Sequence, residues 1–367
     1  IFNQYNLWWG REDVSSSMSE TAKTEQSAKL NSVVDTIISK IPQEREKEII
    51  SRRFGLYDRK ETLELIGDMF GITRERVRQL EKAILTRLRA AVAEGELPSV
   101  IAMEKEITSS LSEMGRVARM QDLASHFLGK EATAIDRARV AFISELAENI
   151  TIVTENDDYY QAAAIDTLGN EKQIRARVEE VVKTIKKHGE PVTAEELHKK
   201  LDYEHPSNIA ALATVSKKLA SLNDQWGLAK WPAVNPKNIR DKIYVVLDTN
   251  GSPMHFSDIA KGIRDSEFNR RSVTTQAIHN ELIKDKRFVL IGRGIYALAS
   301  WGYSRGTVAD IITDILKNSE TPLHRDEIVR QVLDKRQVKE TTILLNLQSK
   351  PQFKRVAKAT YVFEEAA

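Results

Sequence analysis

The sequence predicts a mainly α-helical chain that is built from several small modules carrying short β-hairpins. Two observations predict this fold class. Apolar residues recur at spacings of three and four along much of the chain, as they do on the buried face of a helix. After residue 98, a pattern of helices, a Gly or Pro turn and a pair of strand-like runs occurs four times, which indicates a repeated module. A chain of 367 residues has room for several such modules.

The composition indicates a globular protein without cysteine chemistry. Hydrophobic residues make up 41% and charged residues 29% of the chain, as in ordinary globular domains. Cysteine is absent, which excludes disulfides, thiolate zinc sites and a cysteine nucleophile and is compatible with the reducing cytoplasm, where we expect the protein. No apolar run approaches the roughly eighteen residues of a membrane span, so we expect no membrane partner.

The first stretch of the chain differs in character from the rest of the sequence. We expect that Met18 marks the native start, and that the residues before it are upstream sequence read in frame or the tail of a truncated domain. Alternatively, Trp8 and Trp9 form an aromatic anchor for a partner. The run up to Lys29 is polar and poor in apolar residues, so we expect a flexible lead-in over residues 1–30.

A helix, a sharp turn and a second helix are predicted between Thr62 and Arg89. The apolar positions of the first helix share one face: Leu63, Ile66 and Phe70. Gly71 follows the last of them, where a helix end needs a left-handed residue. Thr73 can cap the next helix, because its hydroxyl can accept a hydrogen bond from an amide of the first turn. This arrangement is a helix-turn-helix.

The second helix of this motif has two faces of different chemistry. Its apolar side consists of Val77, Leu80, Ile84 and Leu88. Its opposite side consists of Arg74, Glu75, Arg78, Gln79 and Lys82. Arg binds guanine O6 and N7, Gln binds adenine and Glu accepts from cytosine N4, and the first turns of a recognition helix enter the major groove. The alternative is a charged face that is only solvated.

The segment from Ile41 to Arg89 closely resembles region 4 of the sigma-70 family of bacterial transcription initiation factors. Three runs carry the resemblance: EREKEIISRRFGL (44–56), TLELIGDMFGITRERVRQLE (62–81) and RLR (87–89). We place the region 4-like unit at residues 31–95. In that family, region 4 binds the promoter −35 element and docks on the flap of the β subunit of RNA polymerase. The resemblance therefore implies double-stranded promoter DNA and the polymerase core as partners.

The resemblance also implies roles for individual residues. By position, Arg74, Glu75 and Gln79 match the base-contacting residues of the family, and Arg78 matches a DNA-contacting arginine. Further DNA-binding residues are expected at Thr73, Lys82, Arg87 and Arg89. Two positions that are often basic in the family are Ala83 and Thr86 here, which removes some backbone contacts. The charge distribution agrees: residues 43–89 hold twelve Lys/Arg against nine Asp/Glu, a net of +3 in a chain whose total is +2.

Four copies of the repeated module are expected after a linker at residues 94–98. Their turn-plus-helix pieces are GRVARMQDLA (115–124), GEPVTAEELH (189–198), GSPMHFSDIA (251–260) and ETPLHRDEIV (320–329). Their closing strand candidates are residues 150–153, 226–231, 288–298 and 353–363. Helix, turn, helix, helix and hairpin together describe a winged helix. We place the modules at residues 100–165, 172–236, 239–302 and 305–365.

The third copy, clearest at residues 240–301, resembles the winged-helix domain of the RNA polymerase delta subunit and its relatives, the HARE-HTH family. The runs GSPMHFSDIA and RFVLIGRGIYAL carry this resemblance. Arg270 and Arg271 open its long helix and Arg293 lies at the wing tip, where they would contact phosphates. The alternative is that these modules contact only proteins. His255 and His324 occupy matching turn positions and are expected to form local hydrogen bonds rather than a metal site.

Catalytic signatures are missing from the sequence. It has no Walker loop, no H-E-x-x-H and no G-x-S-x-G, so we expect no enzyme, no cofactor and no small-molecule substrate. The sequence thus predicts a sequence-specific DNA-binding transcription factor of the sigma-70 type with a winged-helix arm. A polymerase-associated scaffold and the DNA-sensing subunit of a restriction or defence system are the alternatives. No region 2 precedes residue 31, so we expect a lost front half or a factor that does not itself open DNA.

Overall fold

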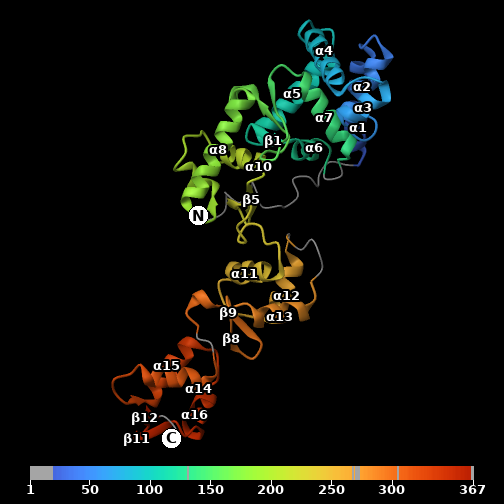
Figure 1. The fold of residues 1–367 in the computed structure, drawn as a ribbon. Coiled ribbons are helices and arrows are strands. Elements are labelled where there is room, and N and C mark those ends of the chain that lie inside the picture. Colours follow the sequence, from blue (N-terminus) through green and yellow to red (C-terminus); the bar gives the residue numbers. More distant parts are fainter. Residues whose placement is uncertain (1–19, 130–131, 267, 269–272, 304–305, 365–367) are drawn as a thin grey trace. The chain divides into compact units, whose positions relative to one another are not determined.

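The computed structural model describes residues 20–129, 132–266, 268, 273–303 and 306–364. The chain is mainly helical, with small three-stranded antiparallel sheets (Figure 1), which confirms the predicted fold class. It divides into two compact units, residues 1–230 and residues 231–367. Each unit is described by itself.

The first unit opens with four helices that contain the helix-turn-helix. They are α1 (Glu20–Ser39), α2 (Glu44–Phe54), α3 (Leu63–Phe70) and α4 (Arg74–Ala93). The predicted turn is confirmed, because Gly71 ends α3 with a left-handed φ of 64° and the Thr73 hydroxyl accepts from the backbone amide of Arg76. Thr62 caps α3 in the same way, through the amide of Leu65.

The expected flexible lead-in is wrong for residues 20–29, which belong to α1. The sequence there is polar, but distant contacts hold it. The Ser27 hydroxyl donates to Asp136 at 3.1 Å, the Lys29 ammonium pairs with Glu106 at 2.5 Å, and Leu30 is fully buried. Residues 1–19, with the two tryptophans and Met18, lie outside the described residues.

The four predicted copies share one topology after residue 97. Each runs helix, strand, helix, helix, strand, strand, and its last strand lies in the middle of a three-stranded sheet. The first copy is α5 (Pro98–Glu113), β1 (Val117–Arg119), α6 (Met120–Leu128), α7 (Ala134–Leu146), β2 (Ile150–Val153) and β3 (Ala162–Ile165). The second, after a 3-10 turn (Asp166–Leu168), is α8 (Glu171–His188), β4 (Val192–Thr193), α9 (Ala194–His198), α10 (Pro206–Val215), β5 (Leu219–Leu222) and β6 (Gln225–Leu228).

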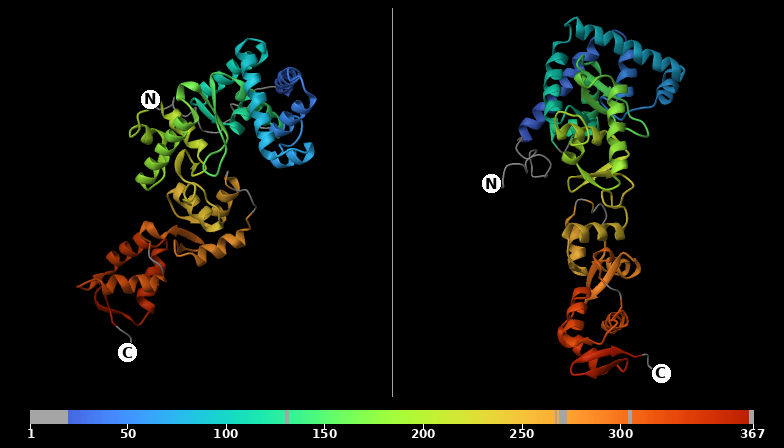
Figure 2. Two further views of the ribbon diagram at one scale, coloured as in Figure 1. Left: turned by 45° about the horizontal axis from the view of Figure 1, so that its top comes forward. Right: turned by 90° about the vertical axis from the view of Figure 1, so that its left-hand side faces the viewer.

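The other two copies form the second unit, drawn from yellow to red in Figure 2. The third copy is α11 (Ile239–Asn250), β7 (Met254–His255), α12 (Phe256–Asp265), α13 (Thr275–Lys284), β8 (Phe288–Gly292) and β9 (Ile295–Leu298), followed by a 3-10 turn (Ala299–Trp301). The fourth is α14 (Val308–Lys317), β10 (Leu323–His324), α15 (Arg325–Lys335), α16 (Glu340–Ser349), β11 (Phe353–Ala357) and β12 (Thr360–Phe363). The order of helices and strands is the one that the repeat predicts; the assignment of the copies as winged helices stays a prediction.

The helix-turn-helix and the first copy share one hydrophobic core. This core is continuous from Leu30 in α1 to Ile165 in β3, and α1 and α4 both pack against α7. The expected linker is only a short turn between α4 and α5, and Leu97 within it is fully buried. The region expected at residues 31–95 is therefore fixed to the first copy rather than tethered to it.

Histidines cap helices in three copies: His255 and His324 cap the second helix of theirs, α12 and α15, whereas His205 caps the third helix of its copy, α10. Nδ1 of His205, His255 and His324 accepts the backbone amide two residues further on, at 3.2–3.3 Å. The expectation that His255 and His324 form local hydrogen bonds is thus confirmed. In the third copy the His255 ring also lies close to the hairpin between β8 and β9. A Cβ added at Gly294 of this hairpin would lie only 2.5 Å from Nε2 of His255. Within the described residues, no helix combines the length and hydropathy that a bilayer crossing requires.

Candidate nucleic-acid interface

The orientation of α4 is determined by its buried side. Val77 is fully buried and packs with Ile49 of α2 and Ile66 of α3 in a small core of their own. The turn before α4 is tight, because a Cβ at Gly67 would lie 2.6 Å from the Ile72 carbonyl oxygen. With Val77 fixed inward, the opposite face of α4 must point into solvent.

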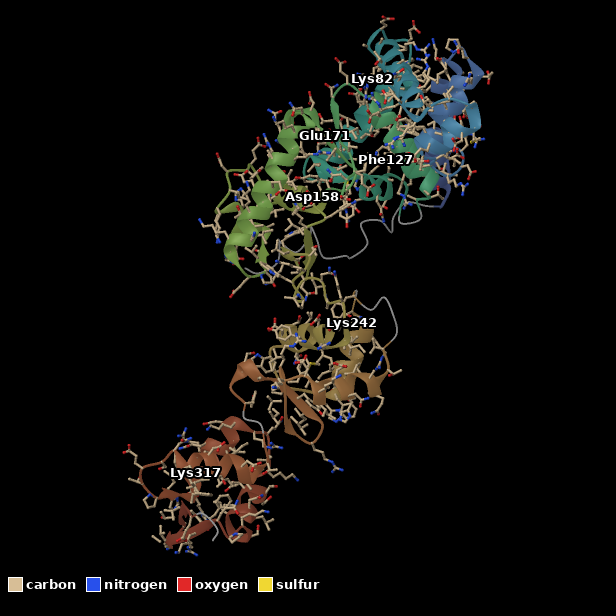
Figure 3. The ribbon with its side chains drawn as sticks, in the orientation of Figure 1. Lys82, Phe127, Asp158, Glu171, Lys242 and Lys317 are labelled. Atoms are coloured by element: carbon tan, nitrogen blue, oxygen red, sulfur yellow. The ribbon has the colours of Figure 1, made fainter. Side chains whose placement is uncertain are left out.

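All the residues predicted on that face are exposed. We call this surface the α4 row: Arg74, Glu75, Arg78, Gln79 and Lys82. The side chain of Lys82 is labelled on α4 in Figure 3. Arg76 is also exposed and donates to the Gln79 side-chain oxygen at 3.3 Å, so it belongs beside the row. The sequence prediction did not include Arg76, although this residue lies within the first turn of the same helix.

Ion pairs order the α4 row without burying it. Arg78 donates two hydrogen bonds to the Glu75 carboxylate, at 2.8 and 2.7 Å, and Gln79 adds a longer one at 3.4 Å. Arg74 pairs with Glu64 of α3 at 3.1 Å. The hydrogen bond from Arg78 lowers the pKa of Glu75, which keeps this carboxylate an acceptor. Exposed pairs of this kind are weak, so a polar ligand can replace them at small cost.

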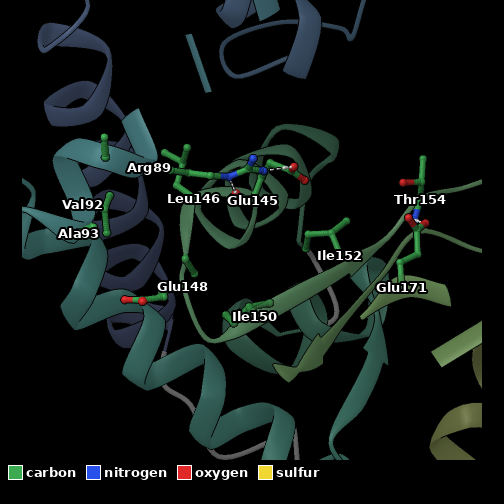
Figure 4. A pocket seen from close by; sticks show the side chains of 12 residues that line it. Arg89, Val92, Ala93, Glu145, Leu146, Glu148, Ile150, Ile152, Thr154 and Glu171 are labelled. Atoms are coloured by element: carbon green, nitrogen blue, oxygen red, sulfur yellow. Dashed lines mark hydrogen bonds and ion pairs between the residues drawn. The ribbon is translucent and has the colours of Figure 1, made fainter. Parts of the chain in front are cut away.

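Two predicted residues lie apart from the row and are engaged within the protein. Arg87 pairs with the buried Glu46 of α2 at 2.5 Å. Arg89 pairs with the carboxylate of Glu145 in α7 at 2.5 Å and donates to its carbonyl oxygen at 2.9 Å (Figure 4). Both arginines brace α4 against neighbouring helices, while about half of each side chain stays exposed.

Below the Arg89–Glu145 pair lies a pocket of about 650 Å³ between the end of α4, the end of α7 and β2 (Figure 4). Three carboxylates line it, from Glu145, Glu148 and Glu171. Burial raises the pKa of Glu145, while Glu171 accepts the backbone amide of Thr154 at 2.7 Å. This acidic lining repels phosphate, so the pocket itself is not suited to binding the DNA backbone.

Of the three DNA-contacting arginines predicted in the third copy, the structure describes one. Arg293 is exposed at the hairpin tip between β8 and β9, as predicted. Arg270 and Arg271 lie outside the described residues.

Comparison with known proteins identifies the helix-turn-helix. The family model "Sigma-70, region 4" matches residues 43–90. A 61-residue stretch is 48% identical to "RNA polymerase sigma factor SigA" of Bacillus sp, covering 16% of this chain. The match spans 15% of that relative's length. The matched residues include the turn at Gly71 and the whole α4 row. Residues 43–90 of this chain are thus a sigma-70 region 4 segment.

Proposed function

We propose that this chain is a DNA-binding transcription factor of the sigma type, and that α4 recognises base pairs of a −35-like promoter element. The carrying observation is the exposed α4 row within a region 4 segment. Arg74 and Arg78 supply forked donors suited to guanine, Gln79 suits adenine, and ionised Glu75 suits the cytosine amino group. Thr73 and Lys82 flank these residues and are assigned to phosphates.

RNA polymerase core is the proposed protein partner, through the β flap on which region 4 docks in the family. The named relative is itself an RNA polymerase sigma factor, which supports this partner. Because α1, α2 and α4 are fixed to the first copy by a common core, polymerase would meet the helix-turn-helix and this copy as one body. Arg87 and Arg89 are about half exposed while they pair with Glu46 and Glu145, which leaves part of each side chain open to a phosphate.

The winged copies are proposed as an arm that contacts DNA, polymerase or both. Arg293 supports a DNA contact by the third copy, whose kinship with the delta subunit stays a prediction. Exposed apolar side chains of the same copy favour the second candidate, a protein-binding scaffold. Ile283 on α13 is 67% exposed and Leu290 on β8 is 44% exposed, and such residues mark protein contacts when they gather in one patch.

Selection of duplexes from a random pool, with and without core polymerase, tests this function. The proposal predicts enrichment of one short motif by the full chain, and stronger retention when polymerase is present. A Gln79→Ala chain should enrich a motif that is relaxed at one position. Enrichment of no motif under either condition would contradict sequence recognition and favour the scaffold.

A further inference from the structure

The fourth copy separates its charges by element. Residues 307–335, which contain α14 and α15, hold four Lys/Arg against six Asp/Glu, a net of −2. Residues 336–364, which contain α16 and the closing hairpin, hold six against two, a net of +4. The total of +2 for the whole chain conceals this contrast. One side of this small module is therefore strongly basic.

The outer face of α16 is exposed and uncharged between its ends. Ile343 and Leu347 point into the core, which turns the opposite positions outward. The outward residues are Thr341, Thr342, Leu345 and Gln348. Leu345 is 63% exposed, although it is a large apolar side chain. Such a face of hydroxyl, amide and methyl groups can meet the edges of bases, including the thymine methyl.

The hairpin after α16 carries the cations. Its exposed basic residues are Lys350, Lys354, Arg355 and Lys358. The strand register shifts between Arg355 and Ala357, which leaves Val356 50% exposed at an irregular position. Such a bulge redirects side chains away from the sheet. This hairpin, which we call the wing of the fourth copy, thus presents positive charge and one exposed apolar side chain.

Most of this charge is not neutralised by the protein. Lys354 pairs with Glu364 at 2.9 Å, whereas Arg355 donates to the Ala357 carbonyl oxygen and pairs with no carboxylate of the described residues. Lys350 and Lys358 make no ion pair with any described part of the chain. On α15, by contrast, Arg330 is held by two carboxylates, from Glu327 and Asp334. A group of cations left unpaired around an uncharged helix face is complementary to a polyanion.

We propose that α16 and the wing of the fourth copy form a second binding surface for double-stranded DNA. Helix α16 enters the major groove, Leu345 contacts bases, and Lys350 and Lys358 contact the flanking phosphates. An α-helix with side chains is about 10–12 Å wide, and the major groove is about 12 Å wide. This surface rests on the proposed DNA contact of the arm and specifies it, but it does not depend on base recognition by α4, because it lies in the other unit.

In the third copy, one cation next to the hairpin is already neutralised. Its Arg287 is held by Asp241 at 3.2 Å and Asp285 at 2.8 Å, so this cation is already neutralised. Near the end of α13, the exposed residue Ile283 is apolar, whereas most of the exposed residues of α16 are polar. The fourth copy differs in combining unpaired cations with a mainly polar exposed helix face.

The test measures binding of the full chain to a duplex of random sequence over a series of KCl concentrations. The variant Lys350→Gln/Lys358→Gln should bind more weakly, and the slope of log K against log[salt] should fall by about 1.8, at about 0.9 per phosphate contact. The control Lys261→Gln/Lys335→Gln removes the same charge from α12 and α15 and should keep the wild-type slope. An unchanged slope in the first variant, or an equal fall in both, would overturn the proposal.

A third variant tests the helix. Leu345→Glu adds an exposed carboxylate to α16 and should weaken binding to every duplex without changing the melting temperature; unchanged binding would remove α16 from the interface. Gln79→Ala, compared with the wild-type chain on duplexes that differ at single base pairs, separates this proposal from the role of α4. If α4 does not recognise bases, Gln79→Ala leaves base preference intact while the wing variant still lowers the slope. If the wing does not bind DNA, the wing variant keeps the wild-type slope while Gln79→Ala still changes the base preference.

Discussion

Single side chains of the α4 row determine which bases the protein can recognise. We expect Gln79→Ala to cost about 1–3 kcal/mol at one base pair and to leave other positions unchanged, because one bidentate contact is lost. Arg74→Ala should act in the same way at a different base pair. Competition binding with single-base variants of the selected duplex measures both effects.

The matched control is Gln43→Ala, since Gln43 is exposed and makes no side-chain cap at the start of α2. It should bind every duplex as the wild-type chain does. If Gln79→Ala lost the same free energy on all sequences, base recognition by Gln79 would be excluded.

The buried hydroxyl of Tyr159 should contribute to the pH dependence of stability at high pH. Tyr159 donates to Glu179 of α8 at 2.8 Å, and burial together with this carboxylate raises its pKa from 10.0 to about 12. A raised folded-state pKa means that its contribution is complete below pH 10 and is lost as the pH rises through 12. Tyr159→Phe should cost about 1 kcal/mol at neutral pH.

The same variant should unfold with a weaker pH dependence above pH 10 than the wild-type chain does. Urea denaturation at several pH values gives both quantities. Tyr160→Phe is the control, because Tyr160 is partly exposed and contacts Arg119 and Lys217 through its ring. Equal pH dependence in wild type and Tyr159→Phe would contradict the assigned hydrogen bond.

At the scale of elements, histidine caps stabilise three of the winged copies. His255→Ala should destabilise the third copy by about 1 kcal/mol, since an N-cap acceptor is lost at α12. His255→Asn should restore most of that loss, because an Asn side chain can accept the same amide. Thermal unfolding of the two variants checks this. Equal destabilisation by both would mean that the ring packs against Phe256 and Gly294 rather than capping.

The elements whose ends depend on local chemistry could be predicted from the sequence. Gly71 and Thr73 fix the turn before α4, and the repeated turns fix the starts of α9, α12 and α15. The start of α1 could not be predicted, because the residues that hold it, Asp136 and Glu106, lie far along the chain. The prediction also missed β5, whose Leu219–Leu222 run precedes the aromatic residues that marked the second hairpin.

The candidate site was predictable to the extent that it lies on one helix. Periodicity places the α4 row outward because Val77 must be buried. Periodicity cannot show that Arg87 and Arg89 turn toward Glu46 and Glu145, since these pairings depend on tertiary packing.

At the scale of the whole molecule, the helix-turn-helix and the first copy should unfold together. Phe142 of α7 is fully buried and its ring lies 4.8 Å from that of Phe54 in α2. Phe142→Ala should cost about 3–5 kcal/mol and should lower hydrogen-exchange protection in α2 and α4 as well as in α7.

The control for this prediction is Phe288→Ala, which removes a buried ring from the third copy in the second unit. It should leave protection in α2 and α4 at the wild-type level. Loss of protection confined to α5–α7 in Phe142→Ala would show that the common core is not a cooperative unit.

Directed cleavage of DNA tests most directly whether α4 lies in the groove of a duplex. The chain contains no cysteine, so Ala83→Cys next to the α4 row offers a single attachment point for a hydroxyl-radical reagent. Ala102→Cys on the exposed side of α5 is the matched control. We expect the first derivative to cut the selected duplex in one short window and the second to leave that window intact. Uniform cutting, or the same pattern from both derivatives, would contradict the placement of α4.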